Sequence, residues 1–163
     1  MDFINPDISH IDLAEFMQEA LKEADLAGQS GELPIGAVIV IHGEIIARGH
    51  ARQKFLQSQI RHAELNAILE GGGRLWNDYK HAILFATVEP CPLCLGAVVM
   101  ADIPHIIFGV HDKNVCSSLT VETNPYVRRH IKSYYGGVLE SESIDILNKY
   151  DPKALQDIQT AST

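Results

Sequence analysis

The chain has 163 residues, of which 46% are hydrophobic and 21% are charged, values typical of a globular protein. This length predicts one domain over residues 1–163, with residues 1–9 and 156–163 held only loosely at its ends. The net charge of −8 argues against a nucleic-acid partner, because phosphate binding needs a basic face, and it favours a small-molecule substrate. We see no long apolar run and no secretory signal, so we expect a cytoplasmic protein without a membrane partner.

The first part of the chain is predicted to hold two helices and a β-hairpin. Helical spacing of apolar residues indicates the helices, and short continuous apolar runs indicate the strands. Gly28 and then Gly71-Gly72-Gly73 should end the two helices. The predicted elements are a helix at 12–27, strands at 35–41 and 44–49, a polar loop at 51–61 and a helix at 62–70.

The second part of the chain continues the alternation of strands and helices. Such alternation predicts an α/β fold in which helices cover a layered sheet. The predicted elements are a strand at 82–88, a helix at 91–101, a strand at 105–109, a loop at 110–123, a helix at 125–132, a short strand at 137–139 and a helix at 143–150.

Two short motifs, His62-Ala63-Glu64 and Pro90-Cys91-Pro92-Leu93-Cys94, carry the clearest chemistry. The imidazole of His62 and the thiolates of Cys91 and Cys94 are zinc ligands, and three protein ligands leave a fourth tetrahedral position for water. Glu64 is then free to move protons between water and a substrate. The combination predicts a hydrolytic site that holds one Zn²⁺.

Each motif lies where a helix is predicted to begin. Unpaired N–H groups make a helix start partly positive, which favours the thiolate forms of Cys91 and Cys94. Pro90 and Pro92 suit this position because their missing N–H groups cost little there. Glu64 lies two residues after His62, about 200° around a regular helix. We therefore expect His62 at or just inside the helix N-terminus, where both side chains face the metal.

From about residue 11 to 148 the chain resembles the cytidine deaminase superfamily. The resemblance rests on Leu33-Pro34-Ile35-Gly36-Ala37, the two zinc motifs and Gly96-Ala97. Within the superfamily it is similar to fungal-type cytosine deaminase, guanine deaminase and bacterial tRNA adenosine deaminase. The resemblance implies a three-layer α/β/α sandwich with a central five-stranded mixed sheet, one catalytic zinc per chain and a homodimer.

The resemblance also implies roles for individual residues. His62, Cys91 and Cys94 would bind zinc, and Glu64 would be the catalytic proton carrier. The candidate substrate contacts are Ala63, Ile35, His50, Phe55, Glu89, His111 and Asp112. In related enzymes the C-terminal segment can close over the pocket, which adds the candidates Tyr150, Asp151 and Asp157.

One position departs from the family pattern. These branches usually carry Asn soon after the second strand, whereas here Gly49-His50 is followed by Ala51, whose side chain cannot form a hydrogen bond. Either His50, Arg52 or Gln53 replaces that Asn, or the substrate differs. Our main hypothesis is a zinc-dependent deaminase that releases ammonia from a free nucleobase or a related small amino-heterocycle, cytosine- or guanine-like.

Two alternatives remain open. One is a tRNA adenosine-to-inosine deaminase, which the acidic charge disfavours. That branch also usually has a Lys-Thr-Gly-like run where Lys113 is followed here by Asn114-Val115-Cys116. The other alternative is a non-catalytic protein stabilised by zinc, with Cys116 as a fourth protein ligand.

Overall fold

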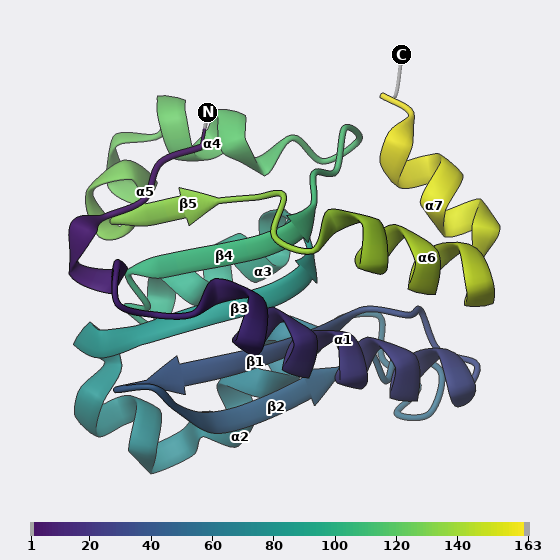
Figure 1. Cartoon of the computed structure of the whole chain (residues 1–163), viewed down its shortest axis with the longest axis horizontal. Coiled ribbons are helices and arrows are strands. Elements are labelled where there is room, and N and C mark those ends of the chain that lie inside the picture. Colours follow the sequence, from purple (N-terminus) through teal and green to yellow (C-terminus); the bar gives the residue numbers. More distant parts are fainter. Residues whose placement is uncertain (1, 162–163) are drawn as a thin grey trace.

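Five strands form a mixed sheet in the order β2–β1–β3–β4–β5 (Figure 1). The computed structural model describes residues 2–161. Strand β1 pairs antiparallel with β2 and β3, whereas β3, β4 and β5 are parallel, so the predicted mixed sheet is confirmed. The strands are β1 (Gly36–Ile41), β2 (Glu44–His50), β3 (Ala82–Val88), β4 (His105–Val110) and β5 (Ser133–Tyr135).

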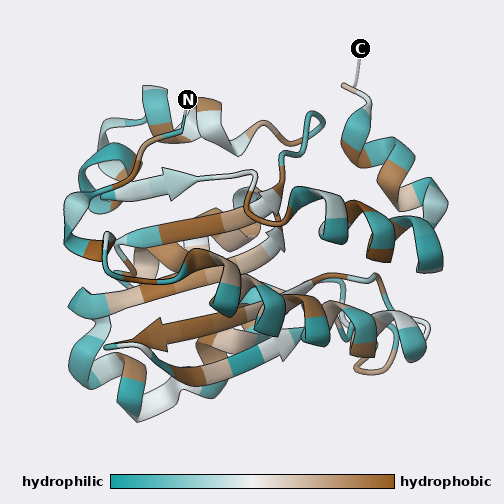
Figure 2. Cartoon of the chain, in the orientation of Figure 1, coloured by the Kyte–Doolittle hydropathy of each residue, from teal (hydrophilic) through white to brown (hydrophobic). Residues whose placement is uncertain are grey.

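The central strands are buried on both faces, which explains their continuous apolar sequences. Along β1, Ile39 and Ile41 join one apolar core, whereas Val38 and Val40 join the core on the opposite face. This alternation follows from the two-residue period of a strand. Figure 2 shows the same concentration of apolar residues along the inner strands.

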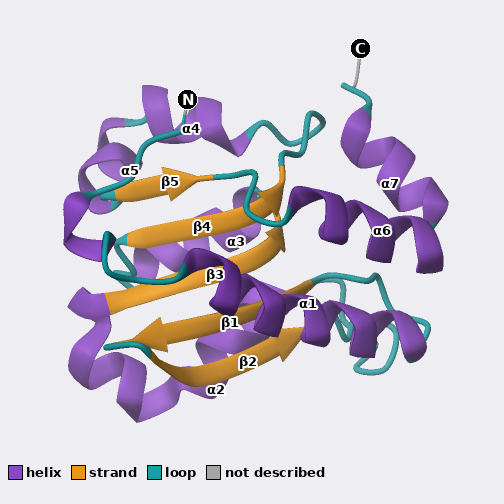
Figure 3. Cartoon of the chain, in the orientation of Figure 1, coloured by secondary structure: helices purple, strands orange, loops and turns teal. Residues whose placement is uncertain are grey.

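Helices cover both faces of the sheet. Helices α1 and α6 lie over one face, and α2 and α3 lie over the other, which confirms the three-layer α/β/α arrangement (Figures 1 and 3). The α-helices are α1 (Leu13–Gln29), α2 (Ala63–Asp78), α3 (Pro92–Met100), α4 (Ser117–Thr123), α5 (Pro125–His130), α6 (Glu140–Tyr150) and α7 (Pro152–Gln159). Two short 3₁₀ helices, η1 (Pro6–Ile8) and η2 (Tyr79–His81), complete the regular elements.

Helix α2 is longer than the predicted helix at 62–70. Gly72 adopts non-helical angles of φ 46° and ψ −130°, so the first helical segment ends at the predicted glycine run, and α2 consists of two helical segments joined by a kink. Glycine reaches such a backbone conformation without a Cβ penalty. The helix then resumes, and Leu75 beyond the kink is buried against the sheet.

The segment after β4 also differs from the prediction. Helix α4 forms inside the predicted loop at 110–123, where it buries Ser117 and Val121. The strand predicted at 137–139 is wrong, because the chain pairs with β4 earlier, through β5. Tyr134 in β5 is fully buried, so burial of this large ring selects the earlier segment.

Both ends of the described chain make regular contacts where we expected loose segments. Phe3 and Tyr134 exchange two backbone hydrogen bonds of 2.8 Å, which attach the N-terminal segment to β5. Helix α7 extends to Gln159, and residues 162–163 of the predicted tail lie outside the described residues, as does residue 1. Within residues 2–161 no helix combines the length and apolar character needed to span a membrane.

Candidate active site

Two helix N-termini meet at the edge of the sheet where β2 and β3 end. His62 is the N-cap of α2 with extended backbone angles of φ −73° and ψ 159°, which confirms its predicted place at the helix start. Cys91 is the N-cap of α3, and Pro92 follows as its first residue. Strand β2 packs tightly against α2, because a Cβ on Gly49 would lie 2.2 Å from the carbonyl oxygen of Ala63. A glycine at this position therefore lets the sheet support the metal ligands directly.

The spacing of His62, Cys91 and Cys94 fits a zinc ion. Their ligand atoms all lie within 4.8 Å of one another. The distances from His62 Nδ1 to the Sγ atoms of Cys91 and Cys94 are 3.4 Å and 3.5 Å. Tetrahedral zinc with ordinary bond lengths would separate such nitrogen and sulfur ligands by about 3.5 Å. The donor set and its spacing therefore match a zinc site with three protein ligands.

The three ligands shift one another's pKa values. A hydrogen bond with Cys94, supported by His62, lowers the pKa of Cys91 to about 4. The hydrogen bond with Cys91, together with burial, raises the pKa of the Cys94 thiol. The interaction with Cys91 also raises the pKa of His62. One thiolate therefore forms readily, and a bound cation would favour the second.

Glu64 lies in the first turn of α2 and is only 4% exposed. Burial raises the pKa of its carboxyl group. Glu64 lines the same cavity as His62 and Cys91. The carboxyl group therefore adjoins the metal-binding group in a position from which it can exchange protons with a substrate.

A cavity of about 300 Å³ opens beside these residues. Of the predicted substrate contacts, the cavity wall includes Ile35, Ala63, Glu89 and Asp112. The wall also contains residues that sequence reasoning did not assign to substrate, namely Leu33, Val88, Asn114, Ala154 and Ile158. These residues come from distant parts of the chain, and apart from Leu33, which belongs to the motif at 33–37, no local motif identifies them.

The other predicted substrate contacts lie outside the lining of this cavity. Nδ1 of His50 lies 2.9 Å from Oε2 of Glu23. His111 packs edge-on against Phe108, with a ring-centroid distance of 4.9 Å. Phe55 is 71% exposed in the loop between β2 and α2.

Glu89 is held by hydrogen bonds from three segments. Its Oε2 accepts the N–H of Asp112 at 2.9 Å. Its Oε1 accepts the N–H of Ser118 at 2.9 Å and the hydroxyl of Tyr134 at 2.7 Å. Both carboxylate oxygens therefore help to position the cavity wall, a role that the sequence pattern did not reveal.

Ala51 is 2% exposed and lines the cavity without offering a polar side chain. Of its three suggested replacements, only Gln53 lines the same cavity. His50 and Arg52 instead line a separate hollow with Glu23. Gln53 donates its Nε2 hydrogen bond to the carbonyl oxygen of Gln59 at 3.0 Å, which fixes the amide at the rim.

Helix α7 supplies one side of the cavity. Asp157, Ala154 and Ile158 line it, and the carbonyl oxygen of Ile158 accepts the N–H of Lys113 at 2.9 Å. The C-terminal candidate Asp151 caps α7 by accepting the N–H of Ala154.

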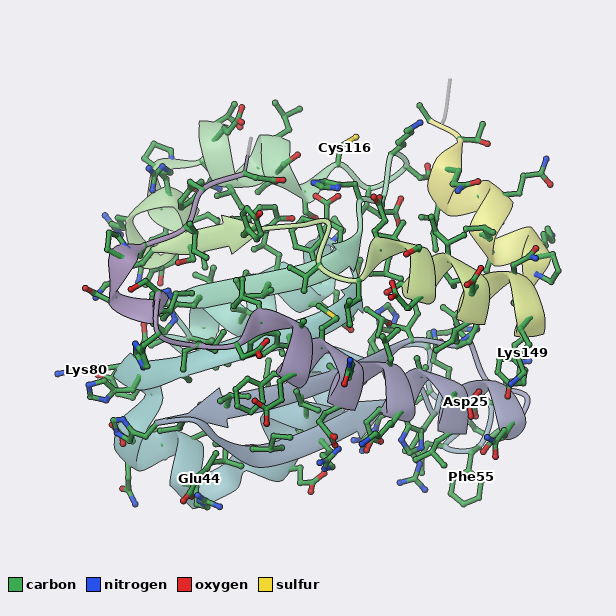
Figure 4. The ribbon with its side chains drawn as sticks, viewed as in Figure 1. Asp25, Glu44, Phe55, Lys80, Cys116 and Lys149 are labelled. Carbon is green, nitrogen blue, oxygen red and sulfur yellow. The ribbon has the colours of Figure 1, made fainter. Side chains whose placement is uncertain are left out.

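Two further candidates lie away from the cavity lining. The hydroxyl of Tyr150 donates to Asp25 at 2.7 Å. Cys116, the suggested fourth ligand, is exposed and donates its thiol to the carbonyl oxygen of Lys113 (Figure 4). It does not belong to the group formed by His62, Cys91 and Cys94.

Several tRNA adenosine deaminases are similar to this chain over most of its length. It is 42% identical over 139 residues to a tRNA-specific adenosine deaminase of Bacillus subtilis, which covers 83% of this chain and 86% of that protein. It is 34% identical over 147 residues to a tRNA-specific adenosine deaminase of Aquifex aeolicus, covering 88% and 96%. A solved structure from a study of A-to-I editing by tRNA:A34 deaminases at the wobble position of transfer RNA has a TM-score of 0.67 and 33% identity, covering 82% of this chain and 99% of that one.

These relatives correct two expectations drawn from the sequence. The hypothesis of a free nucleobase substrate is wrong, because both relatives are tRNA-specific adenosine deaminases. The expected absence of a nucleic-acid partner is wrong for the same reason. The charge argument failed because net charge sums the whole surface, whereas a nucleic acid contacts only one face of it.

The zinc motifs carry the family assignment. The zinc-binding region of cytidine and deoxycytidylate deaminases matches residues 11–110, a segment that contains His62, Glu64, Cys91 and Cys94. The matched segment also includes strands β1 to β4 and helices α2 and α3, which position the cavity. The chain therefore belongs to the cytidine and deoxycytidylate deaminase family.

Proposed function

We propose that this protein converts adenosine to inosine in tRNA by hydrolytic deamination. The observation that carries the proposal is the 42% identity to a tRNA-specific adenosine deaminase across 86% of that relative. The cavity beside His62, Glu64 and Cys91 supports it, because it places a buried carboxyl group next to a metal-binding group. The same substrate class implies a cytoplasmic protein, since tRNA serves translation there.

The metal-binding residues and Glu64 have separate roles in the reaction. His62, Cys91 and Cys94 would hold zinc, and the chemistry that zinc supplies is Lewis-acid activation of water near neutral pH. Glu64 takes a proton from the attacking water and delivers it to N1 of adenine as oxygen adds to C6. Glu64 then takes the remaining proton from the new C6 hydroxyl group and transfers it to the amino group, so the C6 carbonyl forms as ammonia leaves. Adenosine and water thus yield inosine and ammonia, with one carboxyl group serving as base and acid.

Backbone groups can orient the base in the cavity. Ala63 is the first residue of α2 and lines the cavity, and N–H groups in the first turn of a helix have no intrahelical acceptor. Such donors suit the ring nitrogens and the developing carbonyl oxygen of a purine. Ile35 and Val88 supply apolar surface for the ring faces.

The test is formation of inosine in unmodified tRNA by purified protein, measured by mass spectrometry of nucleosides. Glu64→Gln should retain zinc and fold while losing turnover by about 10²- to 10⁴-fold. Glu70→Gln is the matched control, because Glu70 is exposed on the same helix. Absence of inosine with every tRNA tested, or full turnover by Glu64→Gln, would contradict the proposal.

We further propose a homodimer formed through the outer faces of α2 and α3. Both helices expose large apolar side chains, Leu69 and Trp76 on α2 and Leu93 and Met100 on α3. Light scattering should give about twice the chain mass of 18.0 kDa, and Met100→Glu should shift the population toward monomer. A mass of 18.0 kDa for the unaltered protein at micromolar concentration would contradict the dimer.

A further inference from the structure

The loop between β2 and α2 (residues 51–61, the β2–α2 loop) differs in charge from the rest of this acidic chain. Residues 45–63 form the longest stretch of the sequence without Asp or Glu, and they include four cations. Arg48 is neutralised in β2, where it lies 2.7 Å from Glu19 and 3.7 Å from Glu23. The other three, Arg52, Lys54 and Arg61, form no ion pair with any carboxylate in the described part of the chain. Lys54 is exposed and its Nζ donates to the carbonyl oxygen of Gly31 at 2.5 Å, whereas Arg52 and Arg61 are half-buried, so the solvent-exposed positive charge of the loop lies mainly on Lys54.

Phe55 stands at the tip of this loop and is 71% exposed. Figure 4 shows its ring projecting away from the body of the protein. The guanidinium carbon of Arg52 lies 4.8 Å from the ring centroid, a cation–π distance. An aromatic ring that is open to solvent and paired with a cation offers a stacking surface for a nucleic-acid base.

The loop backbone is held in place although its tip is exposed. The buried carboxylate of Glu32 accepts the N–H groups of Lys54 and Phe55 at 3.0 Å and 2.7 Å. The N–H of Arg52 donates to the carbonyl oxygen of Arg61 at 3.0 Å, which closes the base of the loop. A ligand that binds here therefore meets a loop backbone that is already ordered, so binding costs little backbone entropy.

The loop adjoins the zinc cavity. Gln53 and Leu33 line both that cavity and a neighbouring hollow of about 530 Å³ whose wall includes Lys54. A nucleotide whose base enters the zinc cavity must leave its sugar and phosphate at the rim. The next nucleotide along the strand then lies within reach of the β2–α2 loop.

We propose that Arg52, Lys54 and Phe55 bind the nucleotide next to the target adenosine in single-stranded RNA. Phe55 stacks on the flanking base, and Lys54 contacts a backbone phosphate. Arg52 holds the ring and adds positive charge. This inference rests on the proposed tRNA substrate and adds a second contact surface outside the cavity.

The test is the affinity of the protein for an anticodon stem-loop RNA with adenosine at the wobble position, measured by fluorescence anisotropy. Phe55→Leu keeps apolar bulk but removes the ring, and it should raise Kd by about 5- to 100-fold, whereas Phe55→Trp should bind as the unaltered protein does. Lys54→Gln should lower the slope of log Kd against log salt by about 0.7, the value for one phosphate contact. Lys80→Gln is its control, because Lys80 lies at the opposite end of the sheet (Figure 4).

The outcomes separate this inference from the proposed function. Unchanged Kd in Phe55→Leu and an unchanged salt slope in Lys54→Gln would overturn the loop contact, while inosine formation would still stand. Weakened RNA binding by both variants, without inosine formation by the unaltered protein, would support the loop contact and overturn the deaminase proposal. Failure of the unaltered protein to bind the RNA would overturn the loop contact.

Discussion

The hydroxyl of Tyr134 in β5 donates a 2.7 Å hydrogen bond to Oε1 of Glu89, which follows β3. Strand β4 lies between β3 and β5 in the sheet, so this bond links β5 to the residue that follows β3, across the end of β4. Glu89 also lines the cavity. Glu89 in turn holds the backbone at Asp112 and Ser118. One buried tyrosine therefore supports the loop that forms part of the cavity wall.

Tyr134→Phe should lower the free energy of unfolding by about 1–3 kcal/mol, because a buried carboxylate loses one of its hydrogen bonds. The ring remains, so the core keeps its packing against Phe108. Urea unfolding followed by circular dichroism measures the change. The same substitution at exposed Tyr126 is the control, and equal effects of the two would contradict a special role for Tyr134.

Removal of the metal should abolish activity and lower Tm. Zinc that binds only the folded state stabilises it by mass action, so chelation removes that contribution. Cys94→Ala should lose zinc, measured by elemental analysis, whereas Cys116→Ala should retain one zinc per chain because Cys116 lies outside the ligand group. Equal loss of zinc from both variants would show that Cys116 is a ligand.

Gln53 should carry part of the substrate recognition that Ala51 cannot provide. Gln53→Ala removes the polar group at the rim and should lower kcat/KM for tRNA by about 3- to 10-fold, the value of one neutral hydrogen bond. Adding Ala51→Asn to Gln53→Ala should recover activity if the cavity accepts the amide. Gln57→Ala, in the same loop but outside the zinc cavity lining, is the control.

Acidification should weaken the fold through His105. Burial, with a smaller contribution from Lys132, lowers the pKa of His105 to about 4, so the folded protein favours the neutral ring. The unfolded chain has an ordinary histidine pKa of about 6.5 and binds the proton first, so stability falls from pH 6.5 toward 4. His105→Gln should remove about 1–2 kcal/mol of the loss between pH 7.5 and 5, measured by urea unfolding at both pH values. An unchanged pH dependence would contradict this assignment.

Elements that depend on neighbouring residues could be predicted from the sequence, whereas contacts between segments distant in the sequence could not. The buried strands and the helix starts at His62 and Cys91 depend on neighbouring residues, so periodicity and proline placement predicted them. Segment β5 depends on burial of Tyr134 between elements that are distant in sequence, and a local pattern cannot show that. The same holds for the contribution of α7 to the cavity.

The metal site could be predicted from the sequence, whereas the substrate class could not. Three ligands and Glu64 fall in two short motifs whose chemistry is determined by residue type. Substrate class depends on the distribution of charge over one face, and net charge concealed the basic β2–α2 loop. Ala51 signalled a change in recognition, but only the fold distinguished Gln53 from His50 as its neighbour in the cavity.

The position of α7 in the cavity wall has a consequence for the order of assembly. All three metal ligands and Glu64 lie between residues 62 and 94, whereas Ile158 comes from the last helix. A ribosome releases the chain from its N-terminus, so the ligand set emerges well before the segment that walls the cavity. The α7 side of the cavity can therefore form only after this helix has been synthesised, when the ligand set and Glu64 are already present in the chain.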